Sequence, residues 1–245
     1  MKKIKQLVLL LLFSTSYCVF AQHNSGIVTY GQKILIPNKK KSLEHSKFSN
    51  YYNEERKKMN ENSKRISYSL KFNEFEASFI SNKSMSIGES NDDVEYAILH
   101  VGGNGKYYFS SKTNKSLWAH DVFGSDVIVV DTINSNDWKI TKETKLIGKY
   151  KVVKAIKEKQ LGNDKVVDVV AWFAPEIPNS YGPIGHYGLP GLILELQERD
   201  FILFAKEVKF RKKVIQINKP SKGKQLSREE YYIFADKAAR DFIIN

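Results

Sequence analysis

The sequence predicts a mainly β protein of the α+β class: a curved antiparallel meander sheet with a helix at its C-terminal end. Two observations predict it. Short segments of alternating apolar and polar residues follow one another along most of the chain, separated by turn residues. No strand–helix–strand rhythm interrupts them, which argues against a parallel sheet and a dinucleotide-binding fold. The chain has 245 residues, 42% of them hydrophobic, enough for one large domain with a sizeable core.

The first 21 residues have the pattern of a secretory signal peptide. Three lysines precede an apolar stretch from Leu7 to Phe20, and Ala21 offers a small residue at a cleavage point before Gln22. The stretch is shorter than the roughly 20 residues that span a bilayer, which favours cleavage over a retained anchor. Cys18 would be the lipidated residue of a lipoprotein, but the bulky Tyr17 before it does not fit that pattern. We therefore expect one exported domain at 22–245, without cysteine or transmembrane segment, that is periplasmic, outer-membrane associated or secreted.

In the first half of this domain, alternation predicts a series of short strands. They are Gly26–Tyr30, Ile66–Phe72, Phe75–Phe79, Val94–Val101, Lys106–Ser110, Leu117–Ala119 and Val127–Val130. Residues 102–105 are glycine-rich and are expected to join two strands as a hairpin-type turn rather than to cradle a phosphate. A polar insertion at about 38–64 is expected to form a surface helix over 42–64 or a mobile segment.

The second half gives clearer signals. Strands are expected at Lys145–Lys159 around Gly148, at Lys165–Phe173 and at Ile202–Phe210, and Val214–Ile217 could extend the last of these. Another strand is expected over Leu192, Leu194 and Leu196, with all three side chains facing the core. Ser227 and Glu230 form a capping-box pattern that begins a helix over Ser227–Ile243. Its predicted apolar face consists of Tyr231, Phe234, Ala238 and Phe242.

The net charge of +12 is unevenly distributed. Residues 206–224 hold eight basic residues and one acidic residue. An exported protein meets anionic lipid, lipopolysaccharide or acidic protein surfaces rather than nucleic acid, so Lys209, Arg211, Lys212 and Lys213 are candidate contacts for an anionic surface. The alternative is a solvated face that serves solubility alone.

The segment 175–191 is unusually apolar for a loop, and prolines and glycines give it a defined shape. It either folds back over the core or presents an apolar surface to a partner. We expect Pro190 and Gly191 to form a type II turn with a positive φ at Gly191. The residues singled out in and before this loop, as a structural turn or a partner-binding surface, are Trp172, Pro178, Gly182, Pro183, Tyr187, Gly188, Leu189, Pro190 and Gly191.

The hexapeptide Gly188-Leu189-Pro190-Gly191-Leu192-Ile193 resembles the motif that names the GLPGLI family of secreted Bacteroidota proteins. Trp138, the strand around Gly148-Lys149-Tyr150 and Ala171-Trp172-Phe173 follow in the order of that family. The resemblance implies an exported protein, often encoded near outer-membrane transport components, with a sheet similar to the lipoprotein-carrier type of half-barrel. It implies no reaction, because the family has no established activity.

The sequence gives little support for an enzyme. Its five histidines are scattered, and no zinc-protease, nucleophile-elbow or phosphate-loop motif is present. We predict no catalytic residues, no cofactor and no metal. His186 could act as a base with Glu176 or Glu195 nearby in sequence, but a structural role is the simpler interpretation. Three functions stay open: a non-enzymatic envelope protein that binds an apolar ligand or an outer-membrane transport partner, a hydrolase with a site around His186 and Glu176, and a purely structural interaction protein.

Overall fold

The computed structural model describes residues 25–36, 47–83, 92–132, 137–161 and 165–244. The predicted signal peptide and the first part of the predicted insertion lie outside these residues. Twelve strands form one sheet. They are β1 (Gly26–Ile34), β2 (Ile66–Phe72), β3 (Glu76–Lys83), β4 (Lys106–Ser110), β5 (Lys115–Val122), β6 (Ser125–Thr132), β7 (Lys139–Ile147), β8 (Tyr150–Leu161), β9 (Lys165–Ala174), β10 (Leu192–Glu198), β11 (Phe201–Phe210) and β12 (Lys224–Leu226).

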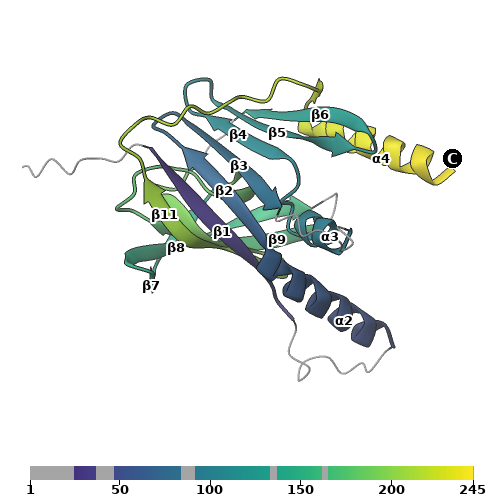
Figure 1. Cartoon of the computed structure of the whole chain (residues 1–245), viewed down its shortest axis with the longest axis horizontal. Helices are drawn as coiled ribbons and strands as arrows, with labels where there is room; N and C mark the ends of the chain where they lie inside the picture. The colour runs from purple at the N-terminus through teal and green to yellow at the C-terminus, as the bar shows by residue number, and fades with distance from the viewer. Residues whose placement is uncertain (1–24, 37–46, 84–91, 133–136, 162–164, 245) are drawn as a thin grey trace, which may run out of the picture.

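The sheet is a pair of meanders joined at β1. Its order is β12-β6-β5-β4-β3-β2-β1-β11-β10-β9-β8-β7, so β1 lies between β2 and β11 and connects the two halves. The pairings are antiparallel except that of β12 with β6, which is parallel. The sheet curves without closing, so that β1–β6 and β8–β11 form two layers (Figure 1). The predicted mainly β architecture with a curved antiparallel sheet and a C-terminal helix is therefore confirmed.

The core lies between these layers. Tyr30, Tyr68, Phe72 and Phe79 are almost completely buried, and Tyr30 donates a hydrogen bond of 2.5 Å to the carbonyl of Ile193 on β10. Bulky aromatic side chains on alternate positions of adjacent strands bury most area per residue, which is why the alternating segments of the sequence become this face.

Three α-helices are described: α2 (Lys47–Asn62), α3 (Asp92–His100) and α4 (Arg228–Ile244). The predicted capping box of α4 is present: the amide of Ser227 donates to Glu230 Oε2 at 2.7 Å, and the amide of Glu230 donates to Ser227 Oγ at 3.2 Å. Within the predicted insertion, 47–62 form α2. None of the helices in the described part of the chain is long and apolar enough to cross a membrane.

The strand predicted over Val94–Val101 is wrong, because this segment forms α3. Val94, Ala97, Ile98 and Val101 are buried at helical spacing, and this pattern outweighs the β-branched composition. The predicted hairpin turn at 102–105 is a helix end instead. Gly102, at φ 67°, donates to Leu99 O, and the next amide donates to Ile98 O, which is a Schellman motif.

Three further predictions need correction. Lys145–Lys159 is two strands, β7 and β8, joined at Gly148, whose φ of 57° favours glycine. Val214–Ile217 does not extend β11, and the short β12 that follows was missed. Phe242 does not share the buried face of α4; it is 68% exposed and contacts the ring of Phe123 at 4.9 Å between centroids.

Candidate functional site

A cleft of about 810 Å³ opens between the two halves of the sheet. One wall comes from β4–β6 and the start of α4, and the other from β8, β10 and the loop that precedes β10; the two layers are visible in Figure 1. The lining is rich in aromatic and charged side chains. The lining includes Tyr107, Trp118, Asp131, Thr132, Trp138, Lys157, Lys159, Ile184, His186, Tyr187, Glu198, Arg228 and Tyr231.

The most deeply buried charged group of the cleft is Glu198, at the end of β10. Its side chain is 5% exposed. Lys159 Nζ donates to both carboxylate oxygens, at 2.8 and 3.0 Å, and His186 Nε2 lies 3.2 Å from Oε2. A buried carboxylate needs such partners, because its desolvation is costly. The three side chains come from β8, β10 and the loop between β9 and β10, so they tie the loop to the sheet.

His186 is neutral in this arrangement. Burial lowers its pKa to about 3, and the charge of Lys157 acts in the same direction. Burial alone would raise the pKa of Glu198, but the hydrogen bond from His186 and the charge of Lys159 outweigh it and lower that pKa to about 2. The ionised carboxylate of Glu198 therefore accepts a hydrogen bond from the Nε2–H group of a neutral imidazole. His186 Nδ1 is then an acceptor, and it is buried without a protein partner.

The backbone beside His186 is strained. Ile184 adopts φ 45° and ψ 43°, in the left-handed region that a β-branched residue rarely enters. Gly185 follows with φ 76°, and a Cβ there would meet the ring of Tyr107 at 3.0 Å. Strained residues cluster at functional sites, where the surrounding structure holds them in place. This strain marks the His186 turn as a shaped part of the cleft.

Stacked rings line the β4–β6 wall. The rings of Tyr107 and Trp118 lie 5.6 Å apart at an interplanar angle of 6°, and Trp118 stacks on His120 at 3.7 Å. His120 Nε2 lies 3.1 Å from the hydroxyl of Tyr231 on α4. Burial lowers the pKa of His120 to about 4, so this histidine is also neutral. The stack gives the cleft one rigid, flat wall.

Trp138 and Lys157 contribute to the opposite wall. The indole Nε1 of Trp138 donates to the carbonyl of Tyr187 at 2.9 Å, and Lys157 Nζ lies 4.6 Å from the centre of the indole ring. Burial, followed by the charge of Lys159, lowers the pKa of Lys157 to about 8. A cation over an aromatic face is a stabilising arrangement, which opposes that loss of charge.

The charges of the cleft balance. Lys157, Lys159, Arg199 and Arg228 oppose Asp131, Asp137, Glu158 and Glu198 among the lining residues. Arg228 and Asp131 form an ion pair across α4 and β6. Among the described residues there is no cluster of three or more potential metal-ligating side chains. The cleft is thus polar and aromatic without excess charge.

The acid predicted as partner for His186 is not the one that the structure places there. Glu176 is exposed, and its charge acts on Tyr150. Glu195 pairs with Lys145 at 2.7 Å, beside the half-buried Trp172, whose ring carries Lys145 Nζ at 4.3 Å from its centre. The missed acid is Glu198. Its only sequence signal is its position two residues after the strand predicted over Leu192, Leu194 and Leu196.

The loop 175–191 folds back into the core. Ile177, Tyr181 and Leu189 are at most 3% exposed. Of the motif residues, Gly182, Pro183 and Gly191 are buried too, Tyr187 and Gly188 are half-buried, and Pro178 and Pro190 are exposed. The predicted type II turn is wrong: the amide of Gly191 donates to Leu189 O at 2.8 Å, which closes a three-residue γ-turn around Pro190. A Cβ at Gly191, φ 159°, would lie 2.3 Å from Ala174 O.

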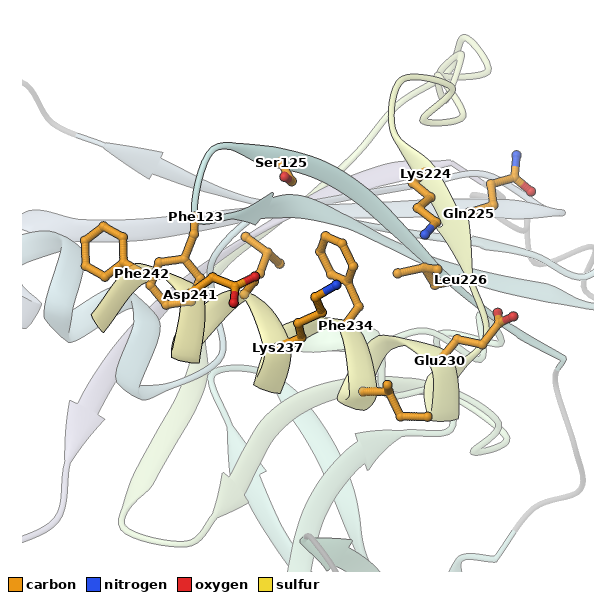
Figure 2. A pocket seen from close by; sticks show the side chains of 13 residues that line it. Phe123, Ser125, Lys224, Gln225, Leu226, Glu230, Phe234, Lys237, Asp241 and Phe242 are labelled. Carbon is orange, nitrogen blue, oxygen red and sulfur yellow. The ribbon is translucent and has the colours of Figure 1, made fainter. Parts of the chain in front are cut away.

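A second concavity, of about 890 Å³, runs along α4. Figure 2 shows Phe234 and Lys237 projecting side by side from α4 toward the strands, with Glu230 and Asp241 toward opposite ends of the helix. This concavity has no buried ionisable group, so the cleft at His186 is the better candidate site. The four basic residues predicted to meet an anionic surface, Lys209, Arg211, Lys212 and Lys213, are all exposed and lie outside both concavities.

Comparisons with known proteins agree with the fold and leave the chemistry open. A family model described as "Protein of unknown function (Porph_ging)", of a Bacteroidota-associated family, matches residues 157–195, which include Lys157, Lys159, the loop and His186. The match does not carry the GLPGLI name. No curated protein matches the chain.

Two solved structures are similar in fold. They are titled "Structure of PNGF-II in P21 space group" and "Structure of PNGF-II in C2 space group", with TM-scores of 0.52 and 0.53. Both are 13% identical to this chain. The alignments cover 88% and 87% of this chain but 34% and 33% of those chains, so this chain spans about a third of the length of these structures. At this identity the similarity concerns the fold alone.

Proposed function

We propose that this protein is an exported, non-enzymatic binding protein and that the cleft at His186 is its ligand site. The observation that supports this most strongly is a preformed cleft of about 810 Å³, within the size range of small-molecule sites, which contains a buried, unpartnered acceptor on a strained turn. A buried acceptor without a partner costs free energy in the empty protein. Because His186 Nδ1 is itself buried, a ligand would reach it when the strained turn at Ile184 shifts, and a hydrogen bond donated to Nδ1 would then recover this cost.

The lining favours an uncharged polar ligand with a flat apolar face. The charges of the cleft cancel, so a net charge on the ligand gains nothing. The stacked Tyr107 and Trp118 offer aromatic surface, and Asp131, Arg228 and Lys157 offer hydrogen-bonding groups near it. This chemistry differs from the apolar ligand expected from the sequence.

The buried His186–Glu198 pair is the one observation that favours a hydrolase instead. A carboxylate that orients an imidazole is part of many nucleophilic sites. A hydrolase would also need a nucleophile at His186 Nδ1, but this atom has no hydrogen-bond partner within the described structure. A pKa of about 3 also makes His186 a weak base near neutral pH. We therefore favour binding over hydrolysis.

The proposal includes the cell envelope as the place of action. The leader-like first 21 residues and the motif around Gly191 support export and membership of the GLPGLI family. Among envelope partners, an outer-membrane transport component or anionic lipid fits the basic surface of the chain best. In this arrangement the cleft would hold a ligand while another face meets the envelope.

A blocked-cleft variant tests the ligand site. Thr132 is an exposed residue of the cleft lining, so Thr132→Trp adds bulk to the cleft without disturbing the core. Thr144→Trp is the matched control, because Thr144 is exposed on β7 outside the cleft. Protein secreted by its native host is analysed by native mass spectrometry. We expect a small molecule on wild type and Thr144→Trp but not on Thr132→Trp.

Two results would contradict the proposal. Equal occupancy of all three proteins would place the ligand elsewhere, and no bound molecule on any of them would remove the evidence for a resident ligand. Turnover of p-nitrophenyl esters by wild type that disappears in His186→Gln, with unchanged thermal stability, would establish the hydrolase instead.

A further inference from the structure

We propose that the outer face formed by Lys71, Lys209 and the loop 211–215 binds the surface of an anionic lipid bilayer, with Val214 entering between the headgroups. This face is separate from the cleft, and the inference does not rest on the cleft having a ligand. It assigns a partner to the basic stretch that the sequence singles out.

Strand register brings the first part of this face together. Ile27 on β1 pairs with Lys71 on β2 and with Lys209 on β11. Directly paired residues of adjacent strands share one face of a sheet, so the three side chains form a row. Val28, the next residue of β1, is fully buried, so the row lies on the outer face. Lys71 and Lys209 are exposed; Lys209 has Glu207 as a salt-bridge partner at 2.8 Å.

The loop after β11 adds three consecutive cations beside this row. Arg211, Lys212 and Lys213 are exposed and line a shallow groove of about 430 Å³ with Lys71 and Ile27. No acidic residue occurs among the described residues that line this groove. The charge of Lys71 also acts on Lys106: burial, followed by this charge, lowers the pKa of Lys106. Juxtamembrane clusters of four or more basic residues are the usual signature of binding to anionic lipid.

The loop is held in a fixed shape. The amide of Arg211 donates to Ser25 O, and the amide of Ile215 donates to Ser25 Oγ, both at 2.9 Å. Asn73 Nδ2 donates to the carbonyl of Ile215 at 2.9 Å. These bonds fasten both ends of the loop to the start of β1 and the end of β2. The conformation that presents the cations is therefore preorganised, which lowers the entropy cost of binding.

The exposed Val214 favours a lipid bilayer over a soluble polyanion as the partner of this face. It lies in this anchored loop directly after three cations, and its side chain is 74% exposed. An exposed apolar residue gives nothing to a hydrophilic polyanion, but it gains free energy when it enters the boundary between headgroups and acyl chains. Cations around an apolar tip are the arrangement that surface-bound membrane proteins use, and this favours lipid over a polysaccharide or nucleic acid.

Vesicle binding tests the proposal. The full-length exported protein is mixed with vesicles of phosphatidylcholine containing about 30% phosphatidylglycerol, or of phosphatidylcholine alone, at low salt. We expect binding to the anionic vesicles only. Each basic residue near such a surface contributes about fivefold in affinity, so Arg211→Ala, Lys212→Ala and Lys213→Ala together should weaken binding about 100-fold, and less at high salt.

Matched controls lie on the β7–β8 edge. Lys139, Lys142 and Lys151 are exposed there, and their replacement by alanine changes net charge by the same amount; we expect less than about threefold loss. Val214→Ser should weaken binding about fivefold or more, whereas Leu146→Ser, at a residue 72% exposed on β7, should not. Thermal melts of all variants should match wild type, because the replaced side chains are exposed.

Three results would overturn the proposal. Equal losses from both triple variants would show an effect of net charge alone. Unchanged vesicle binding by Val214→Ser, together with loss of heparin binding in the Arg211 triple variant, would identify a soluble polyanion as the partner. Absence of binding to anionic vesicles would exclude lipid. Thr132→Trp should bind vesicles like wild type, so failure of the cleft and failure of this surface are distinguishable.

Discussion

Acidification should destabilise this protein through its buried neutral histidines, and His186 gives the test. Its pKa of about 3 in the folded chain lies below the value of 6.5 for an ordinary histidine. A group whose folded pKa is lowered contributes stability that is complete above its unfolded pKa and is lost as pH falls toward the folded value. For His186 the window runs from about pH 6.5 down to about pH 3.

The loss of unfolding free energy at pH 5.0 depends almost wholly on protonation of His186 in the unfolded chain. There the unfolded imidazole is protonated with a pKa 1.5 units above the solution pH, while the folded imidazole stays neutral. This difference amounts to about 2 kcal/mol, compared with about 0.1 kcal/mol at pH 7.5. His120, with a pKa of about 4 and 9% exposure, adds a similar amount, so wild type should lose about 4 kcal/mol from these two groups. Glu198 adds little at this pH, because its window begins near 4.5.

The assay is urea unfolding at pH 7.5 and at pH 5.0, for wild type and for His186→Gln. The glutamine amide can still donate to Glu198 but does not titrate. We expect the loss of unfolding free energy between the two pH values to be about 2 kcal/mol smaller in the variant. Other titrating groups are common to both proteins and cancel in the comparison. An identical pH dependence of both proteins would refute a neutral His186.

Three further predictions follow from the core and the helix cap. Gly191→Val should destabilise by at least about 2 kcal/mol in chemical denaturation, because its Cβ would lie 2.3 Å from Ala174 O. Gly148→Ala measures the backbone cost alone, because its φ of 57° disfavours a side chain but no atom lies within 4 Å of its Cβ, and it should destabilise less than Gly191→Val. Tyr30→Phe should cost about 1–3 kcal/mol in the same assay, because it leaves Ile193 O buried without its donor, and a neutral effect would show that water replaces the hydroxyl. Ser227→Ala should cost about 0.5–2 kcal/mol and lower the amide-exchange protection of α4 first, whereas protection lost evenly across the sheet would contradict a local cap.

The sequence predicted most strands, because period-2 alternation marks a sheet with one buried face. Ile66–Phe72 and Lys106–Ser110 were predicted with the observed bounds. The failures have local causes. Val94–Val101 reads equally well with a period of 2 or 3.6, and only the glycine pair that ends α3 distinguishes them. The three-residue β12 pairs with β6 from almost 100 positions away, so no local pattern predicts it.

The sequence could not predict the site because β10 contains a bulge that no residue pattern signals. Leu192, Leu194 and Leu196 suggest one continuous face, but the pairing of β10 with β9 shifts between Ile193 and Glu195. This bulge reverses the parity of the strand. Leu192 and Leu194 belong to the large core, whereas Leu196 packs on the opposite face with Ala155 and Ala171.

The same parity reversal creates the charged cluster of the cleft. Glu198 follows Leu196 at the next position of its face, and Lys157 and Lys159 follow Ala155 on theirs, so the bulge brings the carboxylate to the lysines and to His186. Without it, Glu198 would point to the aromatic core, where no cation is available. Bulges often re-aim one side chain beside a functional site. The tight turn at Gly191 and the bulge that follows it therefore set the strand register in which His186 contacts Glu198.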